Sequence, residues 1–333
     1  MRTITLEEHF VTQSFLKAIA AAGADGALQQ MAQLHPKLLD VGEGRIAAMD
    51  EAGNDRQVLS LASLGFDDLS SDTATPLARD INDELAEAAR AHADRFSVFA
   101  TLDLKNPASA AKELERAVTK LGFVGTMLDG TTKIAGANPP SLFLDDARFL
   151  PVFEAAAHLG VPIYLHPALP PEAVREAYYR NLPGVLGQVL SIAGWGWHAE
   201  TALHTLRLIV SGVFDRLPSL QLIIGHMGEG LPYAMARSSA ILTRTATLKQ
   251  PVADYFQTNI HITTSGYFTQ PPLRCALDVV GIDRTMFSVD YPFSPNTRGR
   301  EFLEEAAASL SEEDLAKLAH GNAERVLKLP PPA

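Results

Sequence analysis

The chain has 333 residues, of which 47% are hydrophobic and 20% are charged, a composition typical of a folded globular enzyme. Its formal net charge of −11 argues against the basic face of a nucleic-acid-binding protein, so no nucleic-acid partner is expected. The single cysteine, Cys275, excludes a disulfide within the chain and favours a reducing, cytoplasmic location.

In chain order, short apolar runs alternate with alanine-rich amphipathic segments almost to the C-terminus. The apolar runs are too short to span a bilayer, and no signal-peptide pattern opens the chain, so no membrane partner is expected. Apolar residues at three- and four-residue spacing predict helices such as 77–93, 108–122 and 147–160. The predicted strands are 3–7, 56–61, 96–102, 123–128, 162–166, 220–226, 260–264 and 286–290.

Eight strands separated by helices predict parallel pairing, because each parallel neighbour needs a crossover connection. We therefore predict that residues 1–333 form a single α/β domain, a (β/α)8 TIM-like barrel. A doubly wound sheet is the alternative, but no GxGxxG turn follows any strand. The stretch 167–200, which contains several Pro and Gly residues, predicts an insertion after the fifth strand, over the end of the barrel that carries the site.

Acidic and histidine residues stand at the carboxyl ends of several predicted strands. Each alone is explained by a hydrogen-bonded core histidine or a helix N-cap. In a barrel, however, they would converge on one cavity, where burying uncompensated charges would cost several kcal/mol. A divalent metal binds imidazole nitrogen and carboxylate oxygen together, so we predict one such ion per chain and no organic cofactor. The residues are Glu7, His9, His166, His226, Glu229 and Asp290.

The other histidines do not follow this pattern. Four are expected at the surface or in structural roles, three are not assigned as ligands, and Cys275 is expected to pack within a helix. The first group is His35, His92, His158 and His320, and the second is His198, His204 and His261.

Several motifs together resemble the hydroxybenzoate decarboxylase branch of the amidohydrolase superfamily, which includes γ-resorcylate (2,6-dihydroxybenzoate) and 5-carboxyvanillate decarboxylases. They are LEEHF (6–10), YLHP (164–167), GHMGEGLPY (225–233), NIHITTSG (259–266) and FSVDYPF (287–293). The similarity runs nearly the whole length of the chain. It implies an amidohydrolase-type barrel that acts on a small aromatic carboxylic acid, usually as a homodimer or homotetramer.

The resemblance also implies roles for individual residues. The ligands of a Mn2+ or Zn2+ ion would be Glu7, His9, His166 and Asp290. His226 and Glu229 would form a pair that touches the substrate, and Arg237 would meet its carboxylate. Asp290 would protonate the ring carbon that loses CO2, and Asp129 would lie in the substrate pocket. The aromatic residues that could form a slot for the ring are Trp195, Trp197, Tyr291 and Phe293.

Two departures from the family pattern concern the pocket. Ala168-Leu169-Pro170-Pro171 replaces the RNPLP-like segment of the resorcylate enzymes, and Asp129 replaces an Asn. The expected reaction is the reversible decarboxylation of an ortho-hydroxybenzoate such as 2,6- or 2,3-dihydroxybenzoate. The alternatives are a metal-dependent hydrolase of a lactone or amide and, less favoured because structural zinc sites are cysteine-rich, a binding protein with a structural metal.

Overall fold

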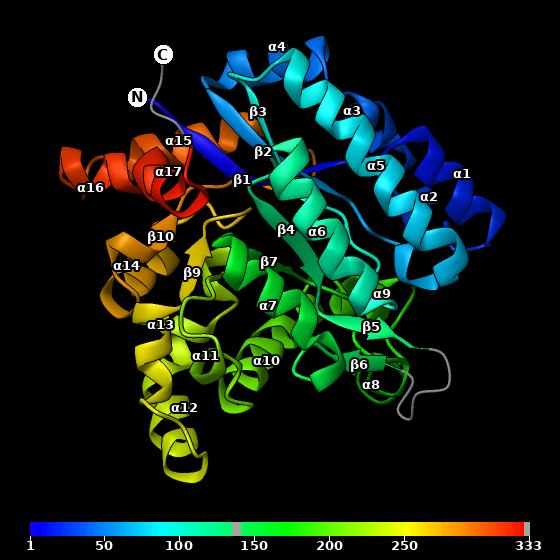
Figure 1. Ribbon diagram of the computed structural model, residues 1–333. Coiled ribbons are helices and arrows are strands. Elements are labelled where there is room, and N and C mark those ends of the chain that lie inside the picture. Colours follow the sequence, from blue (N-terminus) through cyan, green and yellow to red (C-terminus); the bar gives the residue numbers. More distant parts are fainter. Residues whose placement is uncertain (135–140, 330–333) are drawn as a thin grey trace.

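The computed structural model describes residues 1–134 and 141–329, and its centre is an eight-stranded parallel sheet (Figure 1). The strand order is β1-β2-β3-β4-β7-β8-β9-β10, so the sheet follows the chain from its first strand to its last. This confirms the predicted (β/α)8 barrel. The strands are β1 (Ile4–Phe10), β2 (Arg56–Leu61), β3 (Phe96–Ala100), β4 (Gly125–Asp129), β7 (Ile163–His166), β8 (Leu222–Ile224), β9 (Ile260–Thr263) and β10 (Thr285–Met286).

Helices surround the sheet on its outer side (Figure 1). The predicted helices 77–93, 108–122 and 147–160 correspond to α5, α6 and α7, and α5 begins six residues earlier than expected. A two-stranded antiparallel sheet of β5 (Thr131–Lys133) and β6 (Ser141–Phe143) follows β4. The helices are α1 (Gln13–Ala21), α2 (Gly26–Gln29), α3 (His35–Leu39), α4 (Glu43–Ala52), α5 (Ser71–Ala91), α6 (Pro107–Leu121), α7 (Leu150–Leu159), α8 (Glu172–Tyr178), α9 (Leu186–Ser191), α10 (Gly196–Val210), α11 (Val213–Arg216), α12 (Leu231–Thr245), α13 (Tyr255–Thr258), α14 (Gln270–Val279), α15 (Asn296–Ala306), α16 (Glu312–Ala316) and α17 (Asn322–Leu327).

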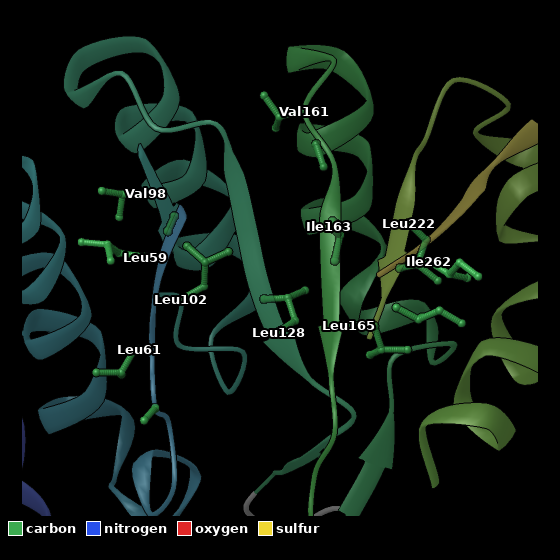
Figure 2. Packing of buried hydrophobic residues seen from close by; sticks show 14 of the residues in the cluster. Leu59, Leu61, Val98, Leu102, Leu128, Val161, Ile163, Leu165, Leu222 and Ile262 are labelled. Atoms are coloured by element: carbon green, nitrogen blue, oxygen red, sulfur yellow. The ribbon is translucent and has the colours of Figure 1, made fainter. Parts of the chain in front are cut away.

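The core has two layers because successive strand residues point to opposite faces of the sheet. Outward-facing residues such as Val98, Ile163 and Ile262 pack against the helices (Figure 2). A smaller cluster fills the interior of the barrel, where it meets Ala323 and Leu327 of α17. The helix therefore closes the amino end of the barrel, which leaves the carboxyl end for polar residues. The strand residues of the inner cluster are Ile4, Leu6, Val58, Phe99, Tyr164, Ile223 and Met286.

A β-bulge in β1 decides which of its polar side chains face inward. Thr5 pairs with Gln57 and Glu8 pairs with Leu59, so β1 advances three residues where β2 advances two. Leu6 belongs to the inner cluster before the bulge, and Glu7 faces the interior directly after it. The bulge thus turns Glu7 inward and its neighbour Glu8 toward residues 288–291, which follow β10.

Hydrogen bonds to the Glu8 carboxylate, together with one between backbone groups, close the barrel between its first strand and the segment after its last. Ladder pairing of β10 ends at Met286, four residues before the predicted strand end at Asp290. The Glu8 carboxylate accepts a hydrogen bond from Tyr291 N at 3.1 Å, and His9 N donates to Tyr291 O at 2.7 Å. Donors that a ladder would have used therefore bond to Glu8, which shortens β10 relative to the prediction.

The predicted insertion after the fifth barrel strand comprises α8, α9 and the start of α10. Its first residues, from Pro167 to Glu172, line a cavity that also reaches His166. None of the helices in 1–134 and 141–329 combines the length and apolar character that crossing a membrane requires.

Candidate metal and catalytic site

Four of the predicted ligands converge at the carboxyl end of the barrel. Glu7 Oε1 lies 3.6 Å from His166 Nε2, and His9 Nε2 lies 3.2 Å from Asp290 Oδ1. The rings of His9 and His166 have centroids 5.0 Å apart. Ligands bound to one ion at about 2.1 Å lie roughly 3 to 4.2 Å from each other, so these two separations suit a shared metal.

Neighbouring groups orient these ligands. The His166 Nδ1–H donates to Asp129 Oδ1 at 3.3 Å, which leaves Nε2 facing Glu7. The Tyr164 hydroxyl donates to Glu7 Oε2, the oxygen that is not turned toward His166. Gly225 allows the carboxylate to come this close, since a Cβ at Gly225 would lie 2.6 Å from Glu7 Oε2. The ligand atoms are therefore held in place before any ion binds.

Two buried polar atoms of this cluster have no hydrogen bond among the described residues, namely Glu7 Oε1 and His9 Nε2. Leaving such atoms without a partner costs about 1–3 kcal/mol each. Glu7, His9 and His166 offer ligand atoms that all lie within 4.8 Å of one another. One carboxylate and two imidazoles form a donor set that Mn2+ or Zn2+ accepts, so the residues present fit the predicted ion.

Burial and mutual charge displace the protonation equilibria of the cluster. Burial raises the pKa of Glu7, but the charges of His226 and His166 outweigh it and hold that pKa below its ordinary value. Burial, together with His166, lowers the pKa of His9 to about 3. Burial and the adjacent Glu7 charge raise the pKa of Asp290 to about 8. His9 is therefore a neutral ligand, and Asp290 differs from Glu7 in its tendency to hold a proton.

A second group of side chains adjoins the first. The His226 Nδ1–H donates to Glu229 Oε1 at 2.8 Å, and its Nε2 lies 3.9 Å from both Glu7 Oε1 and Asp290 Oδ2. His198 Nδ1 donates to the other oxygen, Glu229 Oε2, at 2.6 Å. Burial lowers the pKa of His226, but Glu229 and Glu7 outweigh it and raise that pKa to about 10. His226 is thus a hydrogen-bond donor placed beside Asp290.

Backbone strain is concentrated at the same place. Six described residues other than glycine have a positive φ, and four of them belong to the site. Such conformations cost about 1–3 kcal/mol each and persist only where surrounding contacts hold them. The four are His226 (φ 48°), Met227 (φ 56°), Glu229 (φ 57°) and Asp290 (φ 72°).

The residues predicted to contact the substrate are placed differently from one another. The Phe293 ring lies 5.4 Å from the His9 ring and is partly exposed, as a wall of the site would be. Tyr291 is not brought into the cluster, because its ring packs under the Arg45 guanidinium at 4.9 Å within the outer core. Arg237 is exposed on α12, and no hydrogen bond or ion pair joins it to another described residue, so its role stays a prediction. Trp195 is exposed on the insertion.

A cavity of about 970 Å³ opens beside His166 and Asp129. Ligand cavities typically measure about 300–1,000 Å³, so an aromatic acid with one ring can be accommodated. Both departures from the family pattern line this cavity, the segment Ala168-Leu169-Pro170-Pro171 and Asp129. Asp129 lines the cavity and also bonds to His166, a predicted metal ligand. The sequence did not predict this bond.

The sequence did not assign His198 or Tyr164 to the site. His198 is 28 residues from His226 in the chain, and Tyr164 is an apolar-strand residue two positions before His166. A signal for Tyr164 existed, since residues two apart on a strand share a face. No local pattern pointed to His198. Of the remaining histidines, His204 accepts a hydrogen bond from a backbone amide away from the cluster.

Comparisons with known proteins agree with this geometry. A family model described as amidohydrolase matches residues 32–329. A γ-resorcylate decarboxylase of Polaromonas sp. is 38% identical over 333 residues, which cover 98% of both chains. The structure of a dihydroxybenzoic acid decarboxylase from Polaromonas sp., with bound manganese and the inhibitor 2-nitroresorcinol, is 36% identical with a TM-score of 0.88 over 98% of this chain and 97% of that one. The structure of 5-carboxyvanillate decarboxylase from Sphingomonas paucimobilis is 32% identical with a TM-score of 0.88 over 99% of both chains.

Proposed function

The chain belongs to the amidohydrolase family, and from this premise we propose that it is a metal-dependent decarboxylase of ortho-hydroxybenzoates. The resemblance predicted from the motifs is confirmed by relatives of nearly equal length that are named as decarboxylases. The proposed substrate is a dihydroxybenzoate such as the 2,6- or 2,3-isomer. The proposed reaction is reversible loss of CO2 without oxidation.

Glu7, His9, His166 and Asp290 would hold the divalent ion, Mn2+ or Zn2+. When bound, the ion would chelate the carboxylate and phenolic oxygens of the substrate and favour the phenolate. Glu7 Oε1 and His9 Nε2 support this assignment, because both are buried and neither has a hydrogen bond among the described residues.

The protein must avoid an aryl carbanion, which direct loss of CO2 would leave. Asp290 would therefore first transfer its proton to the ring carbon that bears the carboxylate. The ring loses aromaticity in this step, and the ortho-hydroxyl oxygen becomes carbonyl-like. The bond to the carboxylate then breaks, its electron pair returns to the ring, and CO2 leaves. Asp290 regains a proton from water before the next turnover.

The position of Asp290 is the observation that carries this proposal. Its Oδ1 faces His9 Nε2 at 3.2 Å, on the side of the predicted ion, and its Oδ2 faces His226 Nε2 at 3.9 Å. The Asp290 carboxyl group thus lies between the predicted ligands and the buried pair in which His226 donates to Glu229. His226 would donate a hydrogen bond to the oxygen on which charge develops.

The test is release of CO2 from a panel of hydroxybenzoates, with the metal content of the same sample measured. We expect turnover of at least one ortho-hydroxybenzoate and none of benzoates with only a meta- or para-hydroxyl, because these lack the chelating oxygen. In D2O the product should carry deuterium at the carbon that lost CO2. Product and bicarbonate together should slowly regenerate the acid.

The Asp290→Asn variant tests the proposed proton donor. It retains an oxygen that can bind metal but has no transferable carboxyl proton, so kcat should fall by several orders of magnitude at saturating metal. A variant that keeps both its metal and near-normal kcat would remove Asp290 from this role. Turnover of a lactone or amide, with no CO2 from any ortho-hydroxybenzoate, would instead identify a hydrolase.

A further inference from the structure

We propose that His198 is a positioning residue for the reaction, holding Glu229 so that His226 points at Asp290. This inference rests on the proposed decarboxylation. Neither the fold nor the predicted metal site requires a histidine at this position of α10. His198 hydrogen-bonds to Glu229, and its ring packs against the His226 ring with centroids 5.0 Å apart, so it lies behind the groups that would face the substrate.

The hydrogen bonds divide the Glu229 carboxylate between two histidines. Oε2 accepts from His198 Nδ1 at 2.6 Å, and Oε1 accepts from His226 Nδ1 at 2.8 Å. All three side chains are buried, at 10% exposure or less. A carboxylate held by both oxygens cannot rotate without breaking one of the bonds, so His198 determines the plane in which Oε1 meets His226.

The backbone around Glu229 makes this contact important. His226, Met227 and Glu229 all have a positive φ, so the turn is strained. Its backbone bonds are local, such as Glu229 N to His226 O at 3.2 Å. The His198 bond joins this turn to a helix 31 residues earlier in the chain. It therefore supplies a long-range constraint that the local bonds do not.

The His198 ring is itself fixed. Its Nε2 donates to Ala193 O at 3.2 Å, while Nδ1 donates to Glu229. The Tyr267 ring stands edge-on to it, with centroids 5.4 Å apart. Contacts at both nitrogens and at the ring face leave one orientation, which a residue that merely fills space would not need.

Two variants of His198 and one matched control test the proposal. His198→Ala removes the donor, whereas His198→Gln keeps an amide N–H that can reach Glu229. His204→Ala is the control, because His204 is a buried histidine of the same helix that bonds to Leu144 N and not to Glu229. The assay is CO2 release from 2,6-dihydroxybenzoate, with KM, kcat, bound metal and unfolding free energy determined for each variant.

We expect His198→Ala to lower kcat by about 100-fold, the effect of a displacement of about 1 Å at a reacting group, with KM and bound metal unchanged. His198→Gln should recover a large part of the loss. His204→Ala should lose stability but keep kcat. Wild-type kcat in His198→Ala, or a loss that His204→Ala shares, would overturn the proposal, as would a loss confined to KM or to bound metal.

A second readout does not depend on the reaction. In protein labelled with ¹⁵N-histidine and loaded with diamagnetic Zn2+, the His226 Nδ1–H should exchange slowly with water. His198→Ala should accelerate this exchange at least tenfold, whereas His204→Ala should not. Unchanged exchange in His198→Ala would overturn the positioning role. Absence of CO2 release by the wild type, with accelerated exchange in His198→Ala, would refute the proposed function alone.

Discussion

Asp129 offers the sharpest distinction between two roles at the site. The sequence predicted that it contacts the substrate, whereas its carboxylate accepts the His166 Nδ1–H at 3.3 Å. If the hydrogen bond to His166 is the main role of Asp129, the Asp129→Ala variant should bind metal more weakly but bind substrate as the wild type does. Asp129→Asn should have a smaller effect, because an amide oxygen can still accept the same hydrogen bond.

The magnitude follows from the geometry. Removing the partner of a metal-bound histidine typically costs 10- to 100-fold in metal affinity. The 3.3 Å separation is longer than the 2.7–2.9 Å of a tight charge-assisted bond, and the Asp129 side chain is 27% exposed. The long bond and the partial exposure both favour the lower end of this range. We therefore expect metal affinity to fall by about tenfold, or about 1.4 kcal/mol.

The assay is competition for Mn2+ or Zn2+ between the protein and a chromophoric chelator, followed by kinetics at saturating metal. Asp67→Asn is the control, because Asp67 lines the same cavity but does not bond to His166. It should leave metal affinity within about twofold of the wild type. A higher KM for Asp129→Ala with unchanged metal affinity would refute the metal-side role and favour the substrate role.

Three further predictions concern other parts of the molecule. His166→Ala should bind metal at least 100-fold more weakly and lose activity with it, as measured by metal analysis after dialysis; full occupancy would contradict the ligand assignment. Arg237→Lys should raise KM about tenfold with kcat preserved, because an ammonium does not reproduce a bidentate contact with a carboxylate; an unchanged KM would count against that contact. Burial lowers the pKa of His204 from 6.5 to about 3, so the unfolded chain takes up a proton below pH 6.5 that the folded chain refuses. The unfolding free energy from urea titrations should therefore fall by about 1.4 kcal/mol per pH unit below pH 6.5 through this group, and His204→Gln should flatten that slope; an unaltered slope would exclude His204 as its source.

Much of the fold was predictable because strand and helix periodicities are local properties. Six of the eight barrel strands lie within two residues of their predicted bounds, and α6 and α7 lie within three. The ends of β1 and β10 were not predicted, since the first continues to Phe10 and the second stops at Met286. β1 continues because His9 and Phe10 pair with Ser60 and Leu61 of β2. β10 stops early because the amides of Val289 and Tyr291 bond to Glu8, and hydrophobic periodicity contains no information on such bonds.

In the candidate site, too, some residues could be predicted from local sequence, whereas others depend on long-range contacts. The position of Glu7, His9, His166 and Asp290 at predicted strand ends was enough to expect them together, and the structure brings them together. The direction of Tyr291 was not predictable, because it depends on a buried arginine far away in the chain. The same holds for His198, whose partner is 31 residues distant. Residues whose role depends on one long-range contact have no signature in spacing alone.

The extra residue of β1 selects between two chemically identical neighbours, Glu7 and Glu8. Without the bulge, strict alternation over the same residues would turn Glu8 toward the cavity and leave Glu7 at the closing edge of the barrel. In an alignment with a related protein, a one-residue gap placed at Leu6 therefore changes which of the two glutamates is aligned. The position of the gap decides which glutamate is aligned with the metal-binding residue of the related protein. Grafting LEEHF onto another barrel would require the β-bulge as well as the amino-acid sequence.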